Sequence, residues 1–403
     1  MIRYNKDQWN LAWLETKSVK LIWRVLSSNG AKVYFVGGCV RNSVQGKEIN
    51  DIDIATDALP DEVIKVASDA GLGVITTGYS HGSVSIKIMQ ELFEVTTFRS
   101  DLITDGRHSK VGFSKNILED AKRRDFTMNA LYMTIDGHIF DPILGLEDVI
   151  NERVQFIGDP DKRVREDFLR VLRYFRFLSI YKKNIDSIDQ TLVTVFANAV
   201  PGLKMLSHDR VWSELQKILG AENPYVVLKI MQVCGILKEV LPSAKIDCLQ
   251  RFLQNEDELK LEFQEINRLA ALNLSNFRSW TKNFPLTKDQ NRWIDKLLVN
   301  LKDSSSLRVK GYKYGENLAI VALALLKSDS GATIIREDLA EIKYGSLKRF
   351  PIKSLDLLKF FIPSKELGDE LKRLKDIWFA SDLELSREDL LDELKNNSEM
   401  KYI

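Results

Sequence analysis

Two aspartates, Asp51 and Asp53 in the segment DIDIAT, are the residues of this 403-residue chain best suited to metal chemistry. The segment predicts a β-strand, and side chains at positions i and i+2 of a strand share one face. Two carboxylates on one face supply the oxygen ligands that Mg²⁺ prefers. Carboxylates flanked by isoleucines are costly unless they hold a cation or face an open cleft. We therefore expect both aspartates to be catalytic metal ligands.

A glycine pair, Gly37 and Gly38, precedes the aspartates and follows the apolar run VYFV. Glycine permits a tight turn, and a helix beginning near Val40 would direct free backbone N–H groups toward a phosphate, with the cation of Arg41 beside them. The pair alone also fits an ordinary strand-to-helix turn, because glycine punctuates many connections. Combined with the aspartates, it predicts a site for phosphoryl transfer.

Two further acidic features have different interpretations. Glu94, in LFEVTTFR, lies on another predicted strand and fits either the third carboxylate of the metal site or a solvent-facing strand residue. Asp159 and Asp161 flank Pro160, a pattern that predicts the start of a helix with Asp159 as its N-cap.

A charged stripe runs through residues 159–177, DPDKRVREDFLRVLRYFRF, which we expect to form one well-packed helix. In it, Asp167 and Arg170 would be neighbours at i and i+3. An ionised aspartate accepts from the exocyclic amine of cytosine or adenine, while arginine donates to the adjacent ring nitrogen. Guanine and uracil carry a carbonyl in place of that amine, so the pair would reject them. The alternative interpretation of the same charges is a solvent-exposed helix face with salt bridges between neighbouring side chains.

The elements that would position these residues form two regions. Up to about residue 150, short alternating runs mixed with helix-period segments predict an α/β domain, and beyond Asp159 the apolar period is helical throughout. The expected N-terminal elements are helices at 7–28, 60–71 and 117–124, and strands at 51–55, 82–88, 92–98 and 130–135.

Composition restricts the function further. The 58 Lys and Arg residues against 57 Asp and Glu give a formal net charge of +1, so attraction to nucleic acid has to come from a local patch. The last histidine is His208, which excludes a histidine-rich metal site in the C-terminal half. Three cysteines without metal-ligand spacing predict a reducing, cytoplasmic location, and no apolar run is long enough to span a membrane.

In their order along the chain, these motifs resemble those of the class II tRNA nucleotidyltransferases, the CCA-adding enzymes, of the polymerase-beta-like superfamily. The resemblance extends over nearly the whole chain. Its motifs are GGCVRN, DIDIAT, HGSV with FEVTTFR, DGRH, RRDFTMNAL, DPILGLED, REDFLRVLRYFRF and, more loosely, SHDRVWSELQKIL.

The resemblance implies an α+β fold in four parts. An N-terminal nucleotidyltransferase head with a small mixed sheet would occupy residues 1–150 and hold the catalytic site. An all-α neck at 151–220 would recognise the nucleobase, followed by a helical body at 221–310 and a helical tail at 311–403 that binds tRNA.

The same resemblance implies roles for individual residues. Asp51 and Asp53 would bind two Mg²⁺ ions, with Glu94 as the third carboxylate. Loop 98–113 would be the element that the family uses when it changes from C to A addition. The implied nucleotide-binding residues are Gly37, Gly38, Arg41 and Arg124 for phosphate, Asp125 for the ribose, Asp167 and Arg170 for the base, and Asn129, Arg173 and Arg176 nearby.

Three departures from the family pattern are visible. Asn42 stands where many relatives have aspartate, and Ser207 to Arg210 reads SHDR where relatives commonly have Gly-Glu-Arg, so Asp209 receives no role. Beyond about residue 300 only fragments such as PIKSLDLL match, so no tail residue is assigned to tRNA.

The expected reaction is attack by the 3′-hydroxyl of tRNA on CTP or ATP, with neither a membrane nor a protein partner. The absence of a GRRF-type arginine signature disfavours a bacterial poly(A) polymerase, and the DGRH loop argues against addition of C alone. Addition of A alone stays open. A catalytically silent RNA-binding module is the alternative outside enzymes, and the full set of carboxylates disfavours it.

Overall fold

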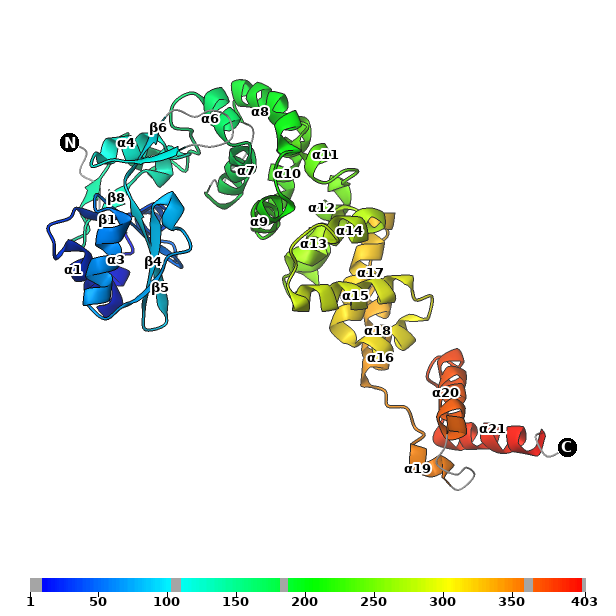
Figure 1. Ribbon diagram of the computed structural model, residues 1–403. Helices are drawn as coiled ribbons and strands as arrows, with labels where there is room; N and C mark the ends of the chain where they lie inside the picture. The colour runs from blue at the N-terminus through cyan, green and yellow to red at the C-terminus, as the bar shows by residue number, and fades with distance from the viewer. Residues whose placement is uncertain (1–8, 103–109, 182–187, 359–364, 401–403) are drawn as a thin grey trace. The chain divides into compact units, whose positions relative to one another are not determined.

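The computed structural model describes residues 9–102, 110–181, 188–358 and 365–400. The chain divides into two compact units, Met1–Val240 and Leu241–Ile403. Within the described residues, every strand lies before residue 141 and only helices follow, as Figure 1 shows. The expected class, an α+β head followed by helices, is confirmed. The division into head, neck, body and tail is finer than these two units and stays a prediction.

The head contains a seven-stranded mixed sheet with the strand order β3-β4-β5-β2-β1-β8-β9. The pairing of β2 with β5 is parallel, and the other pairings in this sheet are antiparallel. In the strand order, β2 lies in the middle of the sheet. The strands are β1 (Val33–Val36), β2 (Ile52–Thr56), β3 (Gly73–Ile75), β4 (Ser83–Ile88), β5 (Glu91–Thr97), β8 (Tyr132–Met133) and β9 (Ile139–Phe140), with a separate pair, β6 (Arg99–Leu102) and β7 (Lys110–Phe113).

Short helices accompany the sheet. Helix α1 packs against α3 and against β1, and the side chains of Phe35, Ile54 and Phe93 form the fully buried centre of the strands. The helices of the head are α1 (Lys17–Ser27), α2 (Gly38–Val44), α3 (Pro60–Asp69), α4 (Ile117–Lys122) and α5 (Leu146–Ile150), with 3₁₀ turns η2 (Ala12–Glu15), η3 (Tyr79–His81) and η4 (Thr127–Asn129).

Sequence patterns misplaced several element boundaries in the head. The single helix expected at 7–28 is wrong: η2 and α1 are separated by Thr16, whose backbone is extended and whose hydroxyl accepts from the backbone N–H of Val19 as an N-cap. The strand expected at 130–135 has only the two residues of β8. Strands β3 and β9, with three and two residues, are too short for a period of two to identify them.

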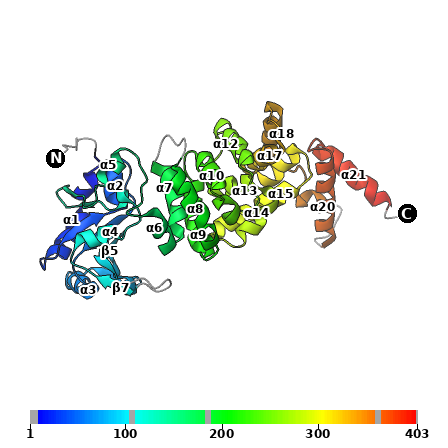
Figure 2. The same ribbon diagram turned by 90° about the horizontal axis from the view of Figure 1, so that it is seen from above.

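Among the described residues, helices α6 to α11 complete the first unit, and Figure 2 labels α6 to α10 beside the head. Helix α7 packs against α9 and α10, and α6 packs against α8. These helices are α6 (Pro160–Glu166), α7 (Leu169–Tyr181), α8 (Gln190–Leu203), α9 (His208–Leu219), α10 (Pro224–Val233) and α11 (Ile236–Val240).

The single helix expected at 159–177 is also wrong. Asp159 does cap α6 through its carboxylate, as predicted, but Asp167 is extended, with φ −154° and ψ 106°. Its carboxylate accepts from the backbone N–H of Leu169, where α7 begins, so a local side-chain bond replaces helix continuation. The adjacent Phe168 packs against Gly202 of α8, where an added Cβ would lie 2.3 Å from the ring.

The regular elements of the second unit, in its described residues, are helices. The Ser386 hydroxyl accepts from the N–H of Asp389 and so caps the last helix, as the sequence predicted. The helices of the second unit are α12 (Ile246–Glu258), α13 (Glu265–Leu272), α14 (Leu274–Thr281), α15 (Lys288–Lys302), α16 (Leu307–Tyr314), α17 (Glu316–Ser330), α18 (Arg336–Leu347), α19 (Ser354–Leu357), α20 (Lys365–Ala380) and α21 (Arg387–Met400).

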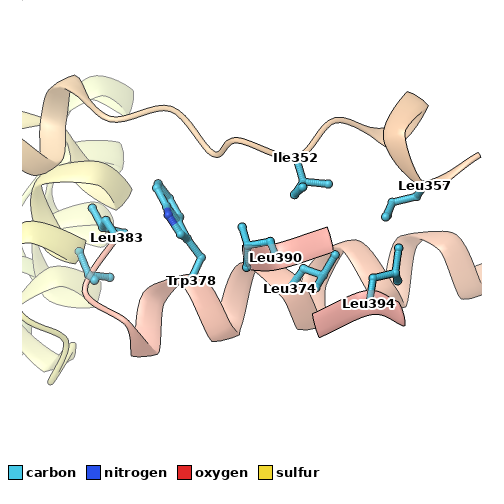
Figure 3. Close-up of a cluster of buried hydrophobic side chains, with 8 residues drawn as sticks. Ile352, Leu357, Leu374, Trp378, Leu383, Leu390 and Leu394 are labelled. Atoms are coloured by element: carbon cyan, nitrogen blue, oxygen red, sulfur yellow. The ribbon is translucent and has the colours of Figure 1, made fainter. Parts of the chain in front are cut away.

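A separate apolar cluster holds the C-terminal helices together, and we call it the tail cluster. Figure 3 shows side chains of α20 and α21 facing those of the chain around α19. Helix α16 contributes Val309 and spans residue 310, where the resemblance places the end of the body. The cluster consists of Val309, Ile352, Leu357, Leu374, Trp378, Leu383, Leu390 and Leu394.

Candidate active site

The predicted carboxylates meet on the central strands of the sheet. Asp53 of β2 lies in register with Glu94 of the parallel strand β5, and Asp51 directly precedes β2. Burial raises the pKa of Asp53 to about 6, and the charges of Glu94 and Asp51 also raise it, while Arg124 and Arg41 act in the opposite direction. The charges of Glu94 and Asp51 therefore act on Asp53 at this point of the sheet.

These carboxylates suit a divalent cation in donor type and in charge. In the part of the chain that the structure describes, no three Asp, Glu, His or Cys side chains are already gathered as a ligand set. Carboxylate oxygens are nevertheless the ligands that Mg²⁺ prefers. The repulsion by Glu94 and Asp51 that helps raise the pKa of Asp53 is also what a bound cation would relieve. The residues present thus fit the metal that the sequence predicts.

An open hollow of about 250 Å³ lies against the two aspartates. Five residues that the sequence predicted line it: Gly38, Arg41, Asp51, Asp53 and Arg176. The rest of its lining consists of Cys39, Asn42, Ile49, Asn50, Phe177, Ile180, Tyr181 and Lys217. The hollow therefore combines carboxylates for a cation with cations for phosphate, contributed by both the head and α7.

The glycine turn lies beside Asp53, as the sequence predicted. Gly37 has φ 74°, in the region that favours glycine, and a Cβ added there would lie 3.9 Å from Oδ2 of Asp53. Helix α2 begins at Gly38, two positions before the expected start at Val40. The turn and the carboxylates thus belong to one site.

Arg41 is the buried cation of the hollow, with 6% of its surface exposed, and burial lowers its pKa. Its Nη1 donates to Oδ1 of Asn129, and its Nη2 donates to the hydroxyl of Tyr181 at 2.5 Å. Asn129 donates in turn to Asp125, which accepts from Nε of Arg173 at 2.7 Å. A hydrogen-bonded chain therefore connects the glycine-turn helix α2 to the middle of α7.

Arg124, which the sequence assigned to phosphate, is committed to a carboxylate of the head. Its Nη2 pairs with Oδ2 of Asp120 at 2.8 Å, and its Nε donates to the hydroxyl of Tyr132. Burial alone would raise the pKa of Asp120, but Arg124 and Arg123 lower it to about 2. A phosphate that binds Arg124 would therefore contact a guanidinium that is already paired with Asp120. The sequence did not single out Asp120.

The predicted base-reading pair is split between two ion pairs. Oδ2 of Asp167 accepts from Nη2 of Arg210 at 2.7 Å, whereas Nη1 of Arg170 lies 2.5 Å from Oε2 of Glu166. The expected pairing of the two side chains on one helix face is wrong, because the helix breaks at Asp167. Asp167 and Arg170 still lie at adjoining helix ends, with the backbone N–H of Arg170 donating to the carbonyl of Asp167 at 3.0 Å.

Glu214 is a residue of the site that the sequence did not identify by function, although it lies in the quoted segment SHDRVWSELQKIL. It is 4% exposed on α9, with Oε2 lying 3.1 Å from Nη1 of Arg176 and Oε1 lying 3.9 Å from Nη1 of Arg173. One buried carboxylate thus pairs with two of the arginines of α7, Arg173 and Arg176. The centre of the loop expected to serve the change from C to A, residues 103–109, lies outside the described residues.

Comparison with known proteins decides the family. Residues 33–155 match a family model described as the poly(A) polymerase head domain, and residues 187–247 match a probable RNA- and SrmB-binding site of polymerase A. The chain is 31% identical over 401 residues to human mitochondrial CCA tRNA nucleotidyltransferase 1, across 95% of this chain and 91% of that protein. This chain belongs to the CCA tRNA nucleotidyltransferase family.

Two further CCA-adding enzymes agree with this membership. The enzyme of Enterococcus faecalis is 29% identical over 393 residues, covering 94% of this chain and 95% of that protein. The crystal structure of the Bacillus stearothermophilus CCA-adding enzyme with CTP has the same fold, with a TM-score of 0.69 and 24% identity over the whole of both chains. Among the described residues, no helix combines the length and apolar character needed to cross a membrane.

Proposed function

We propose that this CCA tRNA nucleotidyltransferase family member adds C, C and A to the 3′ end of tRNA, taking CMP and AMP from CTP and ATP and releasing pyrophosphate. The observation that carries the proposal is the hollow in which the carboxylates of Asp51 and Asp53 face the cations Arg41 and Arg176. Its chemistry suits a metal-bound triphosphate. The match along almost the whole length of a CCA-adding relative supports tRNA as the acceptor.

In this proposal, the 3′-hydroxyl of tRNA attacks the α-phosphate of the nucleotide. Asp51, Asp53 and Glu94 would hold Mg²⁺, which when bound lowers the pKa of the attacking hydroxyl and neutralises charge on the leaving pyrophosphate. The N–H groups at Gly37 and Gly38, with Arg41, would hold the triphosphate. Arg124 would add a phosphate contact from its place beside Asp120.

The remaining residues would position the nucleoside. Asp125 would bind the ribose hydroxyls, held in orientation by Asn129 and Arg173. Asp167 would accept from the amine of cytosine or adenine and Arg170 would donate to the ring. Because both Asp167 oxygens already accept hydrogen bonds, an incoming amine has to share the carboxylate with Arg210 or displace it.

The other parts of the proposal concern the acceptor and the compartment. The helical tail at 311–403 would bind the body of the tRNA. Cys39, Cys234 and Cys248 are free thiols in the structure, which supports a reducing compartment such as the cytoplasm. The human relative carries a mitochondrial name, and fractionation of cells that express this chain would decide between the two locations.

One experiment tests the reaction and separates its alternatives. The protein is incubated with Mg²⁺ and with tRNAs that end before the tail, after one C and after CC, with each NTP alone and with all together, and the products are sequenced. Completion to CCA from all three tRNAs is expected. Extension only from CC would indicate an A-adding enzyme, long A tails a poly(A) polymerase, and no pyrophosphate release an RNA-binding module.

A further inference from the structure

Arg41 is a buried cation whose recorded hydrogen-bond partners are all uncharged. They are the side-chain carbonyls of Asn129 and Asn42 and the hydroxyl of Tyr181, and the described residues place no carboxylate in an ion pair with Arg41. A buried charge without a directly paired counter-ion is costly, and although the charges of Asp125 and Asp53 reach Arg41, desolvation is the larger effect on its pKa. The anion that would repay it is a ligand of the hollow that Arg41 lines.

Tyr181 is the residue that holds this cation from the side of α7. Its hydroxyl accepts from Nη2 of Arg41 at 2.5 Å and donates to Oδ1 of Asn42 at 3.2 Å, and its ring lies 4.2 Å from the guanidinium carbon. It is 6% exposed and lines the hollow. One side chain thus supplies both an acceptor and an aromatic face to Arg41.

The end of α7 is itself fixed to the head. Nζ of Lys47 donates to the carbonyl of Ile180 at 3.1 Å and lies 4.4 Å from the centre of the Tyr181 ring. A cation at the C-terminal end of a helix is favourable, because the last carbonyls carry partial negative charge. The Tyr181 hydroxyl is therefore held at one place relative to α2, as a positioning role requires.

We propose that Tyr181 is a positioning residue for nucleotidyl transfer: its hydroxyl holds the Arg41 guanidinium ready in the lining of the hollow for the phosphate oxygens of CTP and ATP alike. The inference rests on the proposed function, in which Arg41 binds the triphosphate. Because the triphosphate is common to both substrates, Tyr181 acts on nucleotide affinity and leaves base choice to Asp167 and Arg170.

The test is Tyr181→Phe, which removes the hydroxyl and keeps the ring. Loss of one hydrogen bond to a charged group is expected to raise KM by about 10- to 100-fold, equally for CTP and ATP, with kcat and the preference for C over U unchanged. Tyr174→Phe is the matched control, because Tyr174 is buried in the same helix but stacks on Phe156 away from the hollow. It is expected to keep the wild-type KM.

Arg41→Met connects the effect to its cause. It is expected to raise both KM values, and adding Tyr181→Phe to it is expected to change nothing further. Arg41→Gln replaces it if the Met variant fails to fold.

Each adverse result has a distinct meaning. A Tyr181→Phe enzyme with wild-type KM beside an impaired Arg41→Met enzyme would overturn the proposal alone, as would an undiminished effect of Tyr181→Phe in the Arg41→Met background. A lower Tm with unchanged KM would reduce Tyr181 to a structural role. Wild-type KM in the Arg41→Met enzyme would refute the proposed role of Arg41 together with the inference.

Discussion

At Asp53, burial and two nearby carboxylates favour the protonated acid and raise its pKa from 3.8 to about 6. Between these values the folded protein binds more protons than the unfolded chain, so this group stabilises the fold at low pH and its contribution is lost as pH rises through about 6. Without metal at neutral pH, the charged carboxylate costs on the order of 3 kcal/mol. Asp53→Asn is therefore expected to raise Tm in EDTA at pH 7.5 and to lose this advantage near pH 4.

The same substitution separates stability from catalysis. Mg²⁺ is expected to raise the Tm of the wild-type protein at pH 7.5 but to have little effect on Asp53→Asn, which should have no measurable turnover while binding tRNA normally. Asp69→Asn, at an exposed position of α3 in the same head, is the control and should respond to Mg²⁺ as the wild type does. Turnover in Asp53→Asn would contradict the assignment of Asp53 as a metal ligand.

Asp167 is predicted to determine base choice. Asp167→Ala removes the acceptor for the amine of cytosine or adenine, so discrimination of CTP against UTP should fall by about 10- to 100-fold, measured as the ratio of kcat/KM values. Mg²⁺ dependence should be unchanged. Asp161→Ala removes a carboxylate from α6 that pairs with Arg165 near the surface, and it should leave discrimination intact. Unchanged preference for C over U in Asp167→Ala would refute the template role.

Residue-level prediction succeeded where a local rule determines geometry. Asp51 and Asp53, two positions apart, both line the hollow as predicted, although Asp51 stands just before β2, and the positive φ of the turn requires a glycine such as Gly37. Tyr181 could not be found in this way, because its partner Arg41 is 140 positions away and nothing in its neighbourhood marks the hydroxyl. Residues whose function depends on tertiary contacts need the fold before they can be recognised.

At the scale of elements, we expect the break between α6 and α7 to depend on the contact between Phe168 and Gly202. Gly202→Ala would place a Cβ 2.3 Å from the Phe168 ring, so the ring or helix α8 has to shift. We expect a loss of about 1–3 kcal/mol of unfolding free energy and weaker discrimination between CTP and UTP, because the ring adjoins Asp167. Denaturant unfolding and competition between CTP and UTP measure the two effects.

Gly368→Ala is the matched control, because Gly368 lies in helix α20 with open space around its Cα. The change should be neutral or should stabilise the protein by up to about 1 kcal/mol. If Gly202→Ala behaved in the same way, the packing of Phe168 would not maintain the break.

The break between α6 and α7 also shows why the ends of the helices could not be predicted from the sequence. Residues 159–177 keep a helical apolar period across Asp167, so periodicity alone gives one helix. The competing interaction is local and polar, a carboxylate that caps α7, and its strength depends on whether Phe168 finds space beside Gly202. The fold class was predictable from long periodic segments, whereas the position of Asp167 depends on packing that the sequence does not show.

For the whole molecule, the two compact units predict that damage to the tail cluster leaves the nucleotide site intact. Leu374 is fully buried in that cluster, and Leu374→Ala should cost about 2–5 kcal/mol locally. Hydrogen exchange is expected to show lost protection in α16, α20 and α21 and unchanged protection in β1, β2 and β5.

In the same Leu374→Ala variant, the affinity for CTP should persist while the affinity for tRNA falls, because the tail is proposed to bind tRNA. Leu355→Ala, the same change at a side chain that is 72% exposed, should alter neither. A parallel loss of CTP affinity in Leu374→Ala would mean that the head depends on the tail for its stability.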